Sequence, residues 1–368
     1  MSIILDKREL NAALKKIKLV VPSKATIQIL ENVFIKATDD GTALLRGTDL
    51  DLDLEITIQA NGKGQDEVCL NAALFEDLTR PEGSEDQGLV ELQSNSEDSV
   101  TAKIDDLETT LNTSHAKDYP VREKVIGKSA TKYKVEEVLN ELIFVLPAVS
   151  RDPARPHINN VLFIGSDVVS TDGHRLHKGS LPRKVKKDFL LTYEAASALA
   201  KLLAAESNES DVEFSLSKDR VIVSSGDWVL SCKKVDAKLF PPHDRVTPAT
   251  SEFTVEVESD KALKVFKRAQ KLAGGKADGG LQFVCGSKIV VETFNFDRGS
   301  SSTELECLDN TLAKRGAYVP LRVELLAQYV IEGMKVGETA RFGFNGDMDP
   351  VVIRGKRGRL AVVMPRRI

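Results

Sequence analysis

The chain repeats one order of sequence patterns three times, and this repetition constrains its fold more than any other feature. An alternating apolar segment followed by an amphipathic helical pattern occurs at residues 2–17, 132–146 and 252–273. Each repeat continues with a second helical pattern, at residues 70–78, 192–203 and 320–333, and closes with a strand hairpin, at residues 89–104, 212–225 and 340–355. Repeats of roughly 120 residues are domains, because solenoid repeats are much shorter.

The repeats predict an α+β protein of three domains, each with two amphipathic helices packed on antiparallel sheets. We place the domains at residues 1–124, 125–249 and 250–368. A hydrophobic content of 42% supplies enough apolar material for several cores. Asp6 and Lys7 stand where a signal peptide would be apolar, and the longest apolar run, residues 142–149, is too short to span a membrane. We therefore expect a cytoplasmic protein that does not contact membranes.

Motifs for catalysis, cofactors and metals are not found. The cysteines lack Cys-x-x-Cys spacing, which favours buried free thiols over zinc ligands. Gly274 and Gly275 lack the earlier glycine of a phosphate-binding loop, so they predict a turn. His174 lies beside Asp172 and Arg175, an arrangement that indicates either a polar turn or acid–base chemistry, and we favour the turn. We expect no enzyme activity and no cofactor.

Acidic residues alternate with leucines at residues 49–55, which predicts a half-buried strand with an acidic solvent face. A divalent metal site is the alternative interpretation. Basic residues gather instead on one face of two helical patterns, although the chain has 51 basic and 55 acidic residues in total. These stripes contain Arg8, Lys15 and Lys18 in the first repeat and Lys264, Lys267, Arg268 and Lys271 in the third. Each stripe could follow a phosphate backbone or could only be a solvated face, and the matching helix of the second repeat is acidic.

Two segments resemble the bacterial DNA polymerase III beta subunit family, the sliding clamps. Residues 151–176, RDPARPHINNVLFIGSDVVSTDGHRL, are similar to the middle-domain signature of the family. Residues 360–368, LAVVMPRRI, are similar to its Val-Val-Met-Pro-x-Arg-Leu ending, with Ile368 in place of leucine. The resemblance runs along the whole chain in order, and includes its length and its threefold repeat.

The resemblance implies a DNA clamp fold in which two chains close head to tail into a ring around duplex DNA. Such a ring is a processivity factor for DNA replication, without catalytic activity of its own. It tethers other proteins through a pocket that binds a short peptide with apolar anchors. The implied partners are sequence-independent double-stranded DNA, the catalytic subunit of the replicative polymerase, an ATP-dependent clamp loader, other clamp-motif proteins and a second copy of the chain.

The resemblance also implies site residues, which we carry over by matching motifs. The peptide pocket would contain Ile158, Thr171, Gly173, His174, Arg175, Leu176, Pro241, Arg245, Val246, Val362, Met364, Pro365 and Arg366. DNA would be contacted by Lys24 and Arg151, and by the helix residues Arg8, Lys15, Lys264, Lys267 and Arg268. The dimer interface would contain Thr109, Leu111, Lys271 and Leu272.

The chain departs from the family at this interface, where large apolar residues are expected. Thr109 and Lys271 occupy two of the positions, so apolar burial there is reduced. Two alternatives to a stable ring therefore stay open. One is a clamp-derived module that binds the peptide as a monomer, and the other is an enzyme that uses His174.

Overall fold

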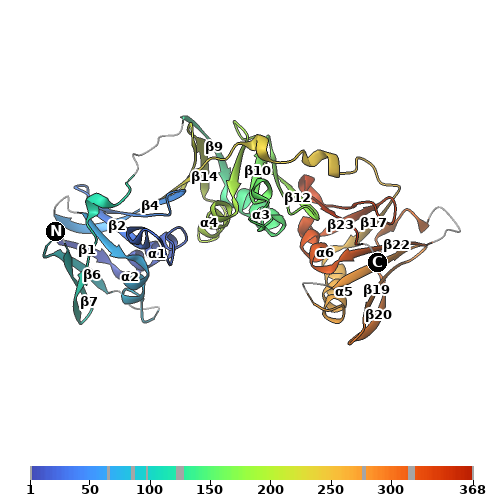
Figure 1. Ribbon diagram of the computed structural model, residues 1–368, viewed down its shortest axis with the longest axis horizontal. Helices are drawn as coiled ribbons and strands as arrows, with labels where there is room; N and C mark the ends of the chain where they lie inside the picture. Colours follow the sequence, from blue (N-terminus) through green and yellow to red (C-terminus); the bar gives the residue numbers. More distant parts are fainter. Residues whose placement is uncertain are drawn as a thin grey trace. The chain divides into compact units, whose positions relative to one another are not determined.

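The computed structural model describes residues 2–63, 67–83, 88–96, 98–121, 128–275, 279–313 and 320–366 (Figure 1). The expected boundary between residues 124 and 125 lies outside these residues, as do Lys276, Arg367 and Ile368. By density of contacts the chain forms two compact units. Unit 1 contains residues 1–136 and 198–234, and unit 2 contains residues 137–197 and 235–368. The second repeat is shared between the units, and the division into three domains stays a prediction.

The same order of elements occurs in all three repeats, which confirms the α+β class. The first repeat contains β1 (Ser2–Asp6), α1 (Lys7–Ile17), β2 (Asn32–Ala37), β3 (Thr42–Thr48), β4 (Leu52–Lys63), β5 (Glu67–Asn71), α2 (Ala72–Leu78), β6 (Leu89–Ser94), β7 (Ser99–Ile104) and β8 (Leu107–Asn112). The second contains β9 (Lys128–Lys134), α3 (Val135–Val145), β10 (Asn160–Ile164), β11 (Asp167–Thr171), β12 (Arg175–Ser180), β13 (Phe189–Thr192), α4 (Tyr193–Leu203), β14 (Asp211–Leu216), β15 (Arg220–Ser225) and β16 (Trp228–Lys233).

The third repeat follows this order with one added short strand, β21. It contains β17 (Phe253–Glu258), α5 (Ser259–Leu272), β18 (Gly280–Cys285), β19 (Ile289–Asn295), β20 (Gly299–Leu305), β21 (Asp309–Asn310), β22 (Leu321–Leu326), α6 (Ala327–Gly333), β23 (Thr339–Phe344), β24 (Val351–Arg354) and β25 (Leu360–Val363). Strands β4, β12 and β20 are therefore equivalent, because each is the fourth strand of its repeat. Strands β8, β16 and β25 are equivalent as the last strands.

Helices α1 and α5 show why these sequences form amphipathic helices on a sheet. The Asp6 carboxylate caps α1 by accepting a hydrogen bond from Glu9 N. Leu10, Leu14 and Ile17, spaced by three or four residues, are fully buried. In α5, Ala262, Phe266 and Ala269 form the buried stripe. Figure 1 shows α6 beside α5, with which it packs. Within the described residues, no helix is long and apolar enough to cross a membrane.

Two sequence expectations about local structure were wrong. Residues 321–326, expected to be helical, form strand β22, because the alternate residues Val323 and Leu325 are fully buried and pair with β18. The acidic segment is not a strand from residue 49. The Asp49 carboxylate accepts hydrogen bonds from Asp51 N and Leu52 N, which makes a turn before β4.

Within β4 the carboxylates face basic side chains and do not form an open acidic surface. Asp53 pairs with Arg220, and Glu55 pairs with Arg46. Among the described residues, no three His, Cys, Asp or Glu side chains lie close enough together to hold a metal ion. Cys69, Cys232 and Cys285 are buried, and burial raises the pKa of each thiol to about 12, so none is a ready nucleophile.

Candidate functional site

The two segments that carry the family resemblance lie side by side in unit 2. Strand β12 pairs antiparallel with β25, so that Arg175 is opposite Val363 and Leu176 is opposite Val362. Met364 N donates a hydrogen bond of 2.9 Å to His174 O just beyond the last pair. The pairing therefore places the middle-domain turn against the C-terminal tail, although nearly 190 residues separate them along the chain.

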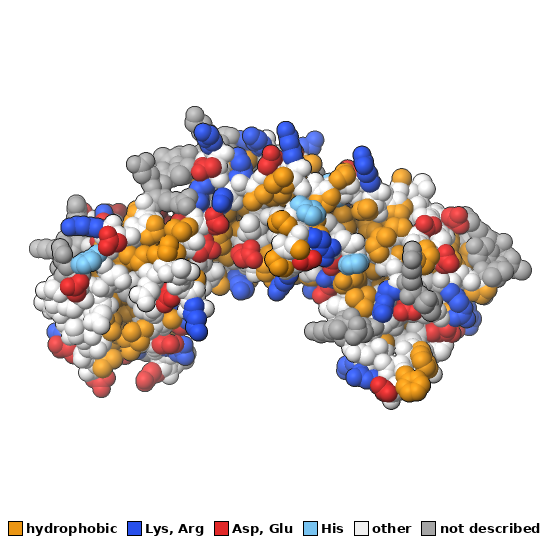
Figure 2. Space-filling model, viewed as in Figure 1, with side chains coloured by type: hydrophobic (Ala, Val, Ile, Leu, Met, Phe, Trp, Pro, Cys, Tyr) orange, Lys and Arg blue, Asp and Glu red, His pale blue; other side chains and the backbone are white. Residues whose placement is uncertain are grey.

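An apolar layer lies under this junction. Leu176 and Val362 are 2% exposed and belong to one buried cluster, whose other members are Leu162, Val169, Leu190, Phe240, Val352 and Leu360. Met364, in contrast, is 37% exposed, and Val246 is 45% exposed in the short helix of residues 243–246. In Figure 2, hydrophobic side chains reach the surface over the part of the sheet that Figure 1 labels β12 and β23. The exposed side chain of Met364 therefore offers a flexible apolar contact above the buried apolar cluster.

The turn at residues 171–175 is fixed by its own hydrogen bonds. Asp172 Oδ1 accepts hydrogen bonds from His174 N at 2.9 Å and from Arg175 N at 3.0 Å. Gly173 has φ of +90°, a conformation that residues with a Cβ rarely adopt. Thr171 Oγ1 donates to Arg175 O at 2.6 Å and closes the base of the turn. His174 is exposed at the tip, as expected of a turn residue.

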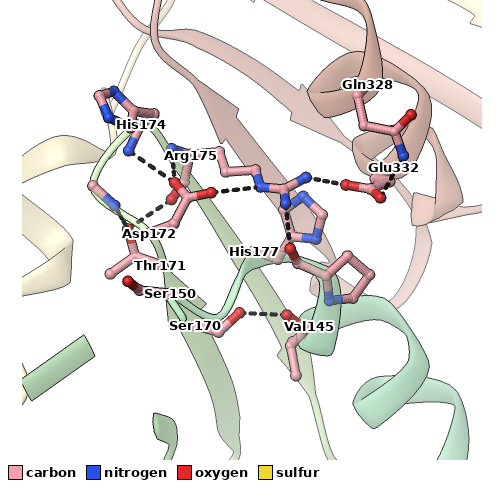
Figure 3. Close-up of polar contacts among 12 residues, drawn as sticks. Val145, Ser150, Ser170, Thr171, Asp172, His174, Arg175, His177, Gln328 and Glu332 are labelled. Carbon is pink, nitrogen blue, oxygen red and sulfur yellow. Dashed lines mark hydrogen bonds and ion pairs between the residues drawn. The ribbon is translucent and has the colours of Figure 1, made fainter. Parts of the chain in front are cut away.

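Arg175 links this turn to the last repeat, as Figure 3 shows. Its guanidinium donates to the Asp172 carboxylate, to Glu332 on α6 and to Pro147 O. It also lies over the ring of Tyr329, 4.2 Å from the centroid. The side chain is only 9% exposed, so Arg175 positions the turn and has little surface left for a ligand. The sequence predicted that Arg175 lines the peptide pocket. It did not predict the contacts of Arg175 with α6, because no motif in α6 points to them.

The other expected pocket residues are distributed around the junction. Ile158 is buried at 4% exposure, and its carbonyl accepts from Ser150 N. Pro241 is half-buried and follows Phe240 of the apolar cluster, whereas Arg245 is exposed. Pro365 is half-buried, and Arg366 N donates to Glu324 O on β22. The tail therefore runs from the turn of the second repeat to the sheet of the third.

A buried histidine lies directly beneath the site. His177 is fully buried on β12, where its Nδ1 is 2.7 Å from Phe144 O and its ring stacks on the Phe144 ring. Its Nε2 has no hydrogen-bond partner among the described residues. Burial lowers the pKa of His177 to about 4, against the opposing effect of the hydrogen bond to Phe144 O. The folded protein therefore holds this imidazole neutral.

This burial predicts a pH dependence of stability. Below about pH 6.5 the unfolded chain protonates His177 and the folded chain does not, so the free energy of unfolding falls with pH until about pH 4. The free energy of unfolding falls by about 3 kcal/mol between about pH 6.5 and about pH 4. Urea unfolding of wild type and His177→Gln at pH 7 and at pH 4.5 measures it. We expect the variant to lose less stability on acidification. Equal losses in the two proteins would contradict the assignment.

The expected DNA-contacting residues are at the surface of their own units. In unit 1, Lys15 and Lys24 are exposed and Arg8 is half-buried. In unit 2, Lys264, Lys267 and Arg268 are exposed along α5, opposite its buried stripe. Arg151 is exposed and lies over the Tyr193 ring at 4.2 Å. Lys18, which the sequence placed in the first stripe, pairs instead with Glu76 at 2.9 Å.

The expected interface residues lie at two edges of the sheets. Thr109 is half-buried on β8 and Leu111 is 8% exposed, packed into the core of its own repeat. Lys271 is exposed and Leu272 half-buried at the end of α5. Within the described residues, β8 pairs only with β7, and β20, which packs on α5, pairs only with β19. Leu107, 44% exposed on β8, is an apolar edge residue that the sequence analysis missed.

Solved structures of bacterial clamps have this fold. The C. crescentus beta sliding clamp matches with a TM-score of 0.90 at 20% identity, covering 100% of this chain and 99% of that one. The sliding clamp of Bartonella birtlesii, solved bound to griselimycin, matches with a TM-score of 0.89 at 22% identity over 100% of both chains. The likeness defines the class of protein: the chain has the sliding clamp fold.

Sequence comparison gives similarity to the same class of protein. Residues 1–123 match the family model described as DNA polymerase III beta subunit, N-terminal domain. The beta sliding clamp of Bacillus subtilis (strain 168) is 22% identical over 377 residues, which cover 96% of each protein. The first third of the chain matches the DNA polymerase III beta subunit family, and the whole chain is similar to the beta sliding clamps in sequence and in fold. The resemblance noted in the sequence is confirmed.

Proposed function

We propose that this protein is a sliding clamp: two copies close into a ring around duplex DNA, and the junction of β12 and β25 tethers polymerases and other DNA-processing proteins. The observation that carries the ring is the pairing of equivalent strands between repeats. In each case the fourth strand of one repeat pairs with the last strand of the next.

The two internal junctions have the same geometry. Strand β4 pairs antiparallel with β16, from Leu52 opposite Cys232 to Ile56 opposite Trp228. Strand β12 pairs antiparallel with β25, from Arg175 opposite Val363 to Lys178 opposite Leu360. Both end in the same hydrogen bond of 2.9 Å, from Lys233 N to Asp51 O and from Met364 N to His174 O. A third junction would join the remaining equivalents, β20 and β8.

A second copy supplies that third junction. Strand β20 belongs to the last repeat and β8 to the first, so the contact between copies is head to tail. A head-to-tail contact closes into a ring when the rotation between copies permits it. In a ring of two copies, the strands β4, β12 and β20 of each copy are all paired with β16, β25 or β8. No strand of these two kinds is then left with an unpaired edge. Closure also covers two exposed sheet edges that would otherwise promote aggregation.

A closed ring needs only weak and sequence-independent contacts with DNA, because topology keeps it in place. The cationic stripe of α5 fits this requirement, since Lys264, Lys267 and Arg268 are exposed basic side chains of the kind that contact phosphates. The proposal assigns no catalytic step and no cofactor. It places the protein in the cytoplasm, with access to the chromosome.

The β12–β25 junction fits a peptide with apolar anchors. Exposed Met364 above the buried Leu176 and Val362 gives a deformable apolar surface for different partners. A polymerase catalytic subunit held there has a high effective concentration at the primer end, so its processivity rises without tight DNA binding. An ATP-dependent loader and other clamp-motif proteins would use the same site.

Retention on end-blocked DNA tests the encircling function. The protein is incubated with linear duplex DNA carrying biotin at both ends, streptavidin is added, and the complex is washed at about 1 M salt, where phosphate contacts are screened. We expect protein to remain bound until a restriction enzyme cuts the DNA. Release by the wash alone would contradict the proposal.

The α5 stripe predicts the salt dependence of the initial DNA contact. For a Lys264→Ala, Lys267→Ala, Arg268→Ala variant, the slope of log affinity against log salt should fall by about 0.9 for each lost phosphate contact. Fluorescence anisotropy with a short duplex measures this slope. The control is Lys132→Ala with Lys134→Ala, because those lysines pair with Glu213 and Asp211. An equal change of the slope in both variants would show that α5 does not contact the DNA.

A further inference from the structure

The hairpin of β19 and β20 carries two exposed phenylalanines, one near the end of β19 and one in the turn. Phe294 is 75% exposed and Phe296 is 91% exposed, whereas Phe253, Phe266, Phe283 and Phe342 of the same repeat are at most 2% exposed. An aromatic ring in water is costly, and two at one tip form an apolar patch of the kind that marks an interface. Among the described residues, both rings remain mostly exposed to solvent.

The repeat places this tip in a third junction. Its equivalents are the turn at Asp49–Asp51 before β4 and the turn at Asp172–His174 before β12, each of which accepts a hydrogen bond from a backbone N–H at the end of a last strand. Asp53 lies opposite Ser231 in the first junction, and Leu176 lies opposite Val362 in the second. The equivalent positions in the third are Ser300 and Thr110. Phe294 pairs with Ser300 within its own hairpin, so it shares the face of that contact.

The end of β8 has room to receive the tip. A pocket of about 590 Å³ is lined there by Val68, Ser99, Val100, Thr113 and His115, among other residues. Its backbone matches the first junction, because Thr113 N donates to Asp98 O as Lys234 N donates to Asp219 O. With antiparallel pairing of β20 and β8, the turn that contains Phe296 extends past Asn112 toward this pocket, while Phe294 lies beside Ser300 on β19.

A difference in side-chain size between the junctions explains why the pocket is open. In the first junction Arg220 is 2% exposed, and its guanidinium donates to Asp51 O and pairs with Asp53. The equivalent residue in the first repeat is Ser99, because both lie opposite the last residue of the closing strand. A small residue here leaves space that Arg220 fills elsewhere, and the third tip carries large rings in place of Asp51.

We propose that Phe296 anchors the contact between copies by docking in the pocket around Ser99 of a second copy, with Phe294 packed beside it on the face of the same junction. This contact rests on the proposed ring. It supplies apolar anchor residues at an interface where Thr109 and Lys271 provide none. The facing edges agree in chemistry. With Ser300 opposite Thr110, Ser301 lies opposite Thr109, so uncharged hydroxyl side chains meet at these two positions of the junction.

The test is the dissociation constant of the dimer, measured by sedimentation velocity over a dilution series. For Phe294→Ser with Phe296→Ser, we expect it to rise by about 10- to 100-fold, since buried aromatics dominate interface energies. The matched control is Met348→Ser, which removes an apolar side chain that is 47% exposed in the same unit and should change nothing. A double variant within about twofold of wild type would overturn the proposal while leaving the ring intact.

Filling the pocket tests the contact from the other side. Ser99→Trp should weaken dimerisation by at least tenfold, because the indole would occupy the space for Phe296. Unchanged dimerisation in this variant would also overturn the proposal. A wild-type protein that stays monomeric at every concentration is a different outcome, since it would remove the proposed ring itself and this contact with it.

Discussion

Deletion of residues 364–368 is expected to abolish binding of a partner peptide while the protein keeps its fold and its oligomeric state. The deletion removes Met364, whose side chain is 37% exposed, and the hydrogen bonds from Met364 N to His174 O and from Arg366 N to Glu324 O. It leaves β25 through Val363 in place, so the buried cluster around Val362 is kept.

The affinity should fall at least 100-fold, about 2.7 kcal/mol, because a central apolar anchor contact is lost. Fluorescence anisotropy with a labelled peptide from a replicative polymerase measures it. A shorter deletion of residues 367 and 368 is the control, since it keeps Met364, Pro365 and Arg366. Unchanged affinity after the longer deletion would show that the peptide site lies elsewhere.

Arg359→Ala should cause the largest loss of stability. Arg359 forms a bidentate ion pair with Glu141 of α3, with Nη2 2.8 Å from Oε1 and Nε 3.0 Å from Oε2. The Glu141 side chain is 4% exposed, so removal of the arginine leaves a buried carboxylate without its counter-charge. Such a change costs about 3 to 5 kcal/mol. The pair connects α3 to the loop before β25, on which the peptide site depends.

Urea unfolding followed by circular dichroism measures this effect. The control is Lys356→Ala in the same loop, because Lys356 and its partner Glu338 are mostly exposed, and such a surface pair contributes little to stability. The double variant Glu141→Leu with Arg359→Met should recover most of the loss, since apolar replacements remove the uncompensated charge. A loss below about 1 kcal/mol in Arg359→Ala would contradict this account.

The sequence predicted the fold through features that are local and repeated. The helices at residues 7–17, 135–145 and 259–272 are strongly amphipathic, and their periodicity specifies which face is buried. The segment at residues 321–326 was misread because its leucines and valine suit a helix and a strand equally. Pairing with β18, which decides between them, is a long-range contact.

The sequence predicted those parts of the site whose chemistry follows from a local motif. It did not predict residue roles that depend on contacts with other elements of the fold. The turn at Asp172 and Gly173 and the exposed Met364 follow from the residues themselves. The role of Arg175 depends on Glu332 and Tyr329, which α6 brings to it. Likewise, the sequence around Phe294 and Phe296 is typical of the end of a buried apolar strand. Only the position of the hairpin shows that both rings are exposed.

The measurement that tests the central claim most directly is the mass of the protein in solution, by light scattering coupled to size exclusion, at micromolar and at nanomolar concentration. The paired internal junctions and the two remaining edges predict a dimer of about twice the chain mass of 40.3 kDa. A monomer at both concentrations would contradict the ring, and would indicate a clamp-derived module that binds peptides without encircling DNA.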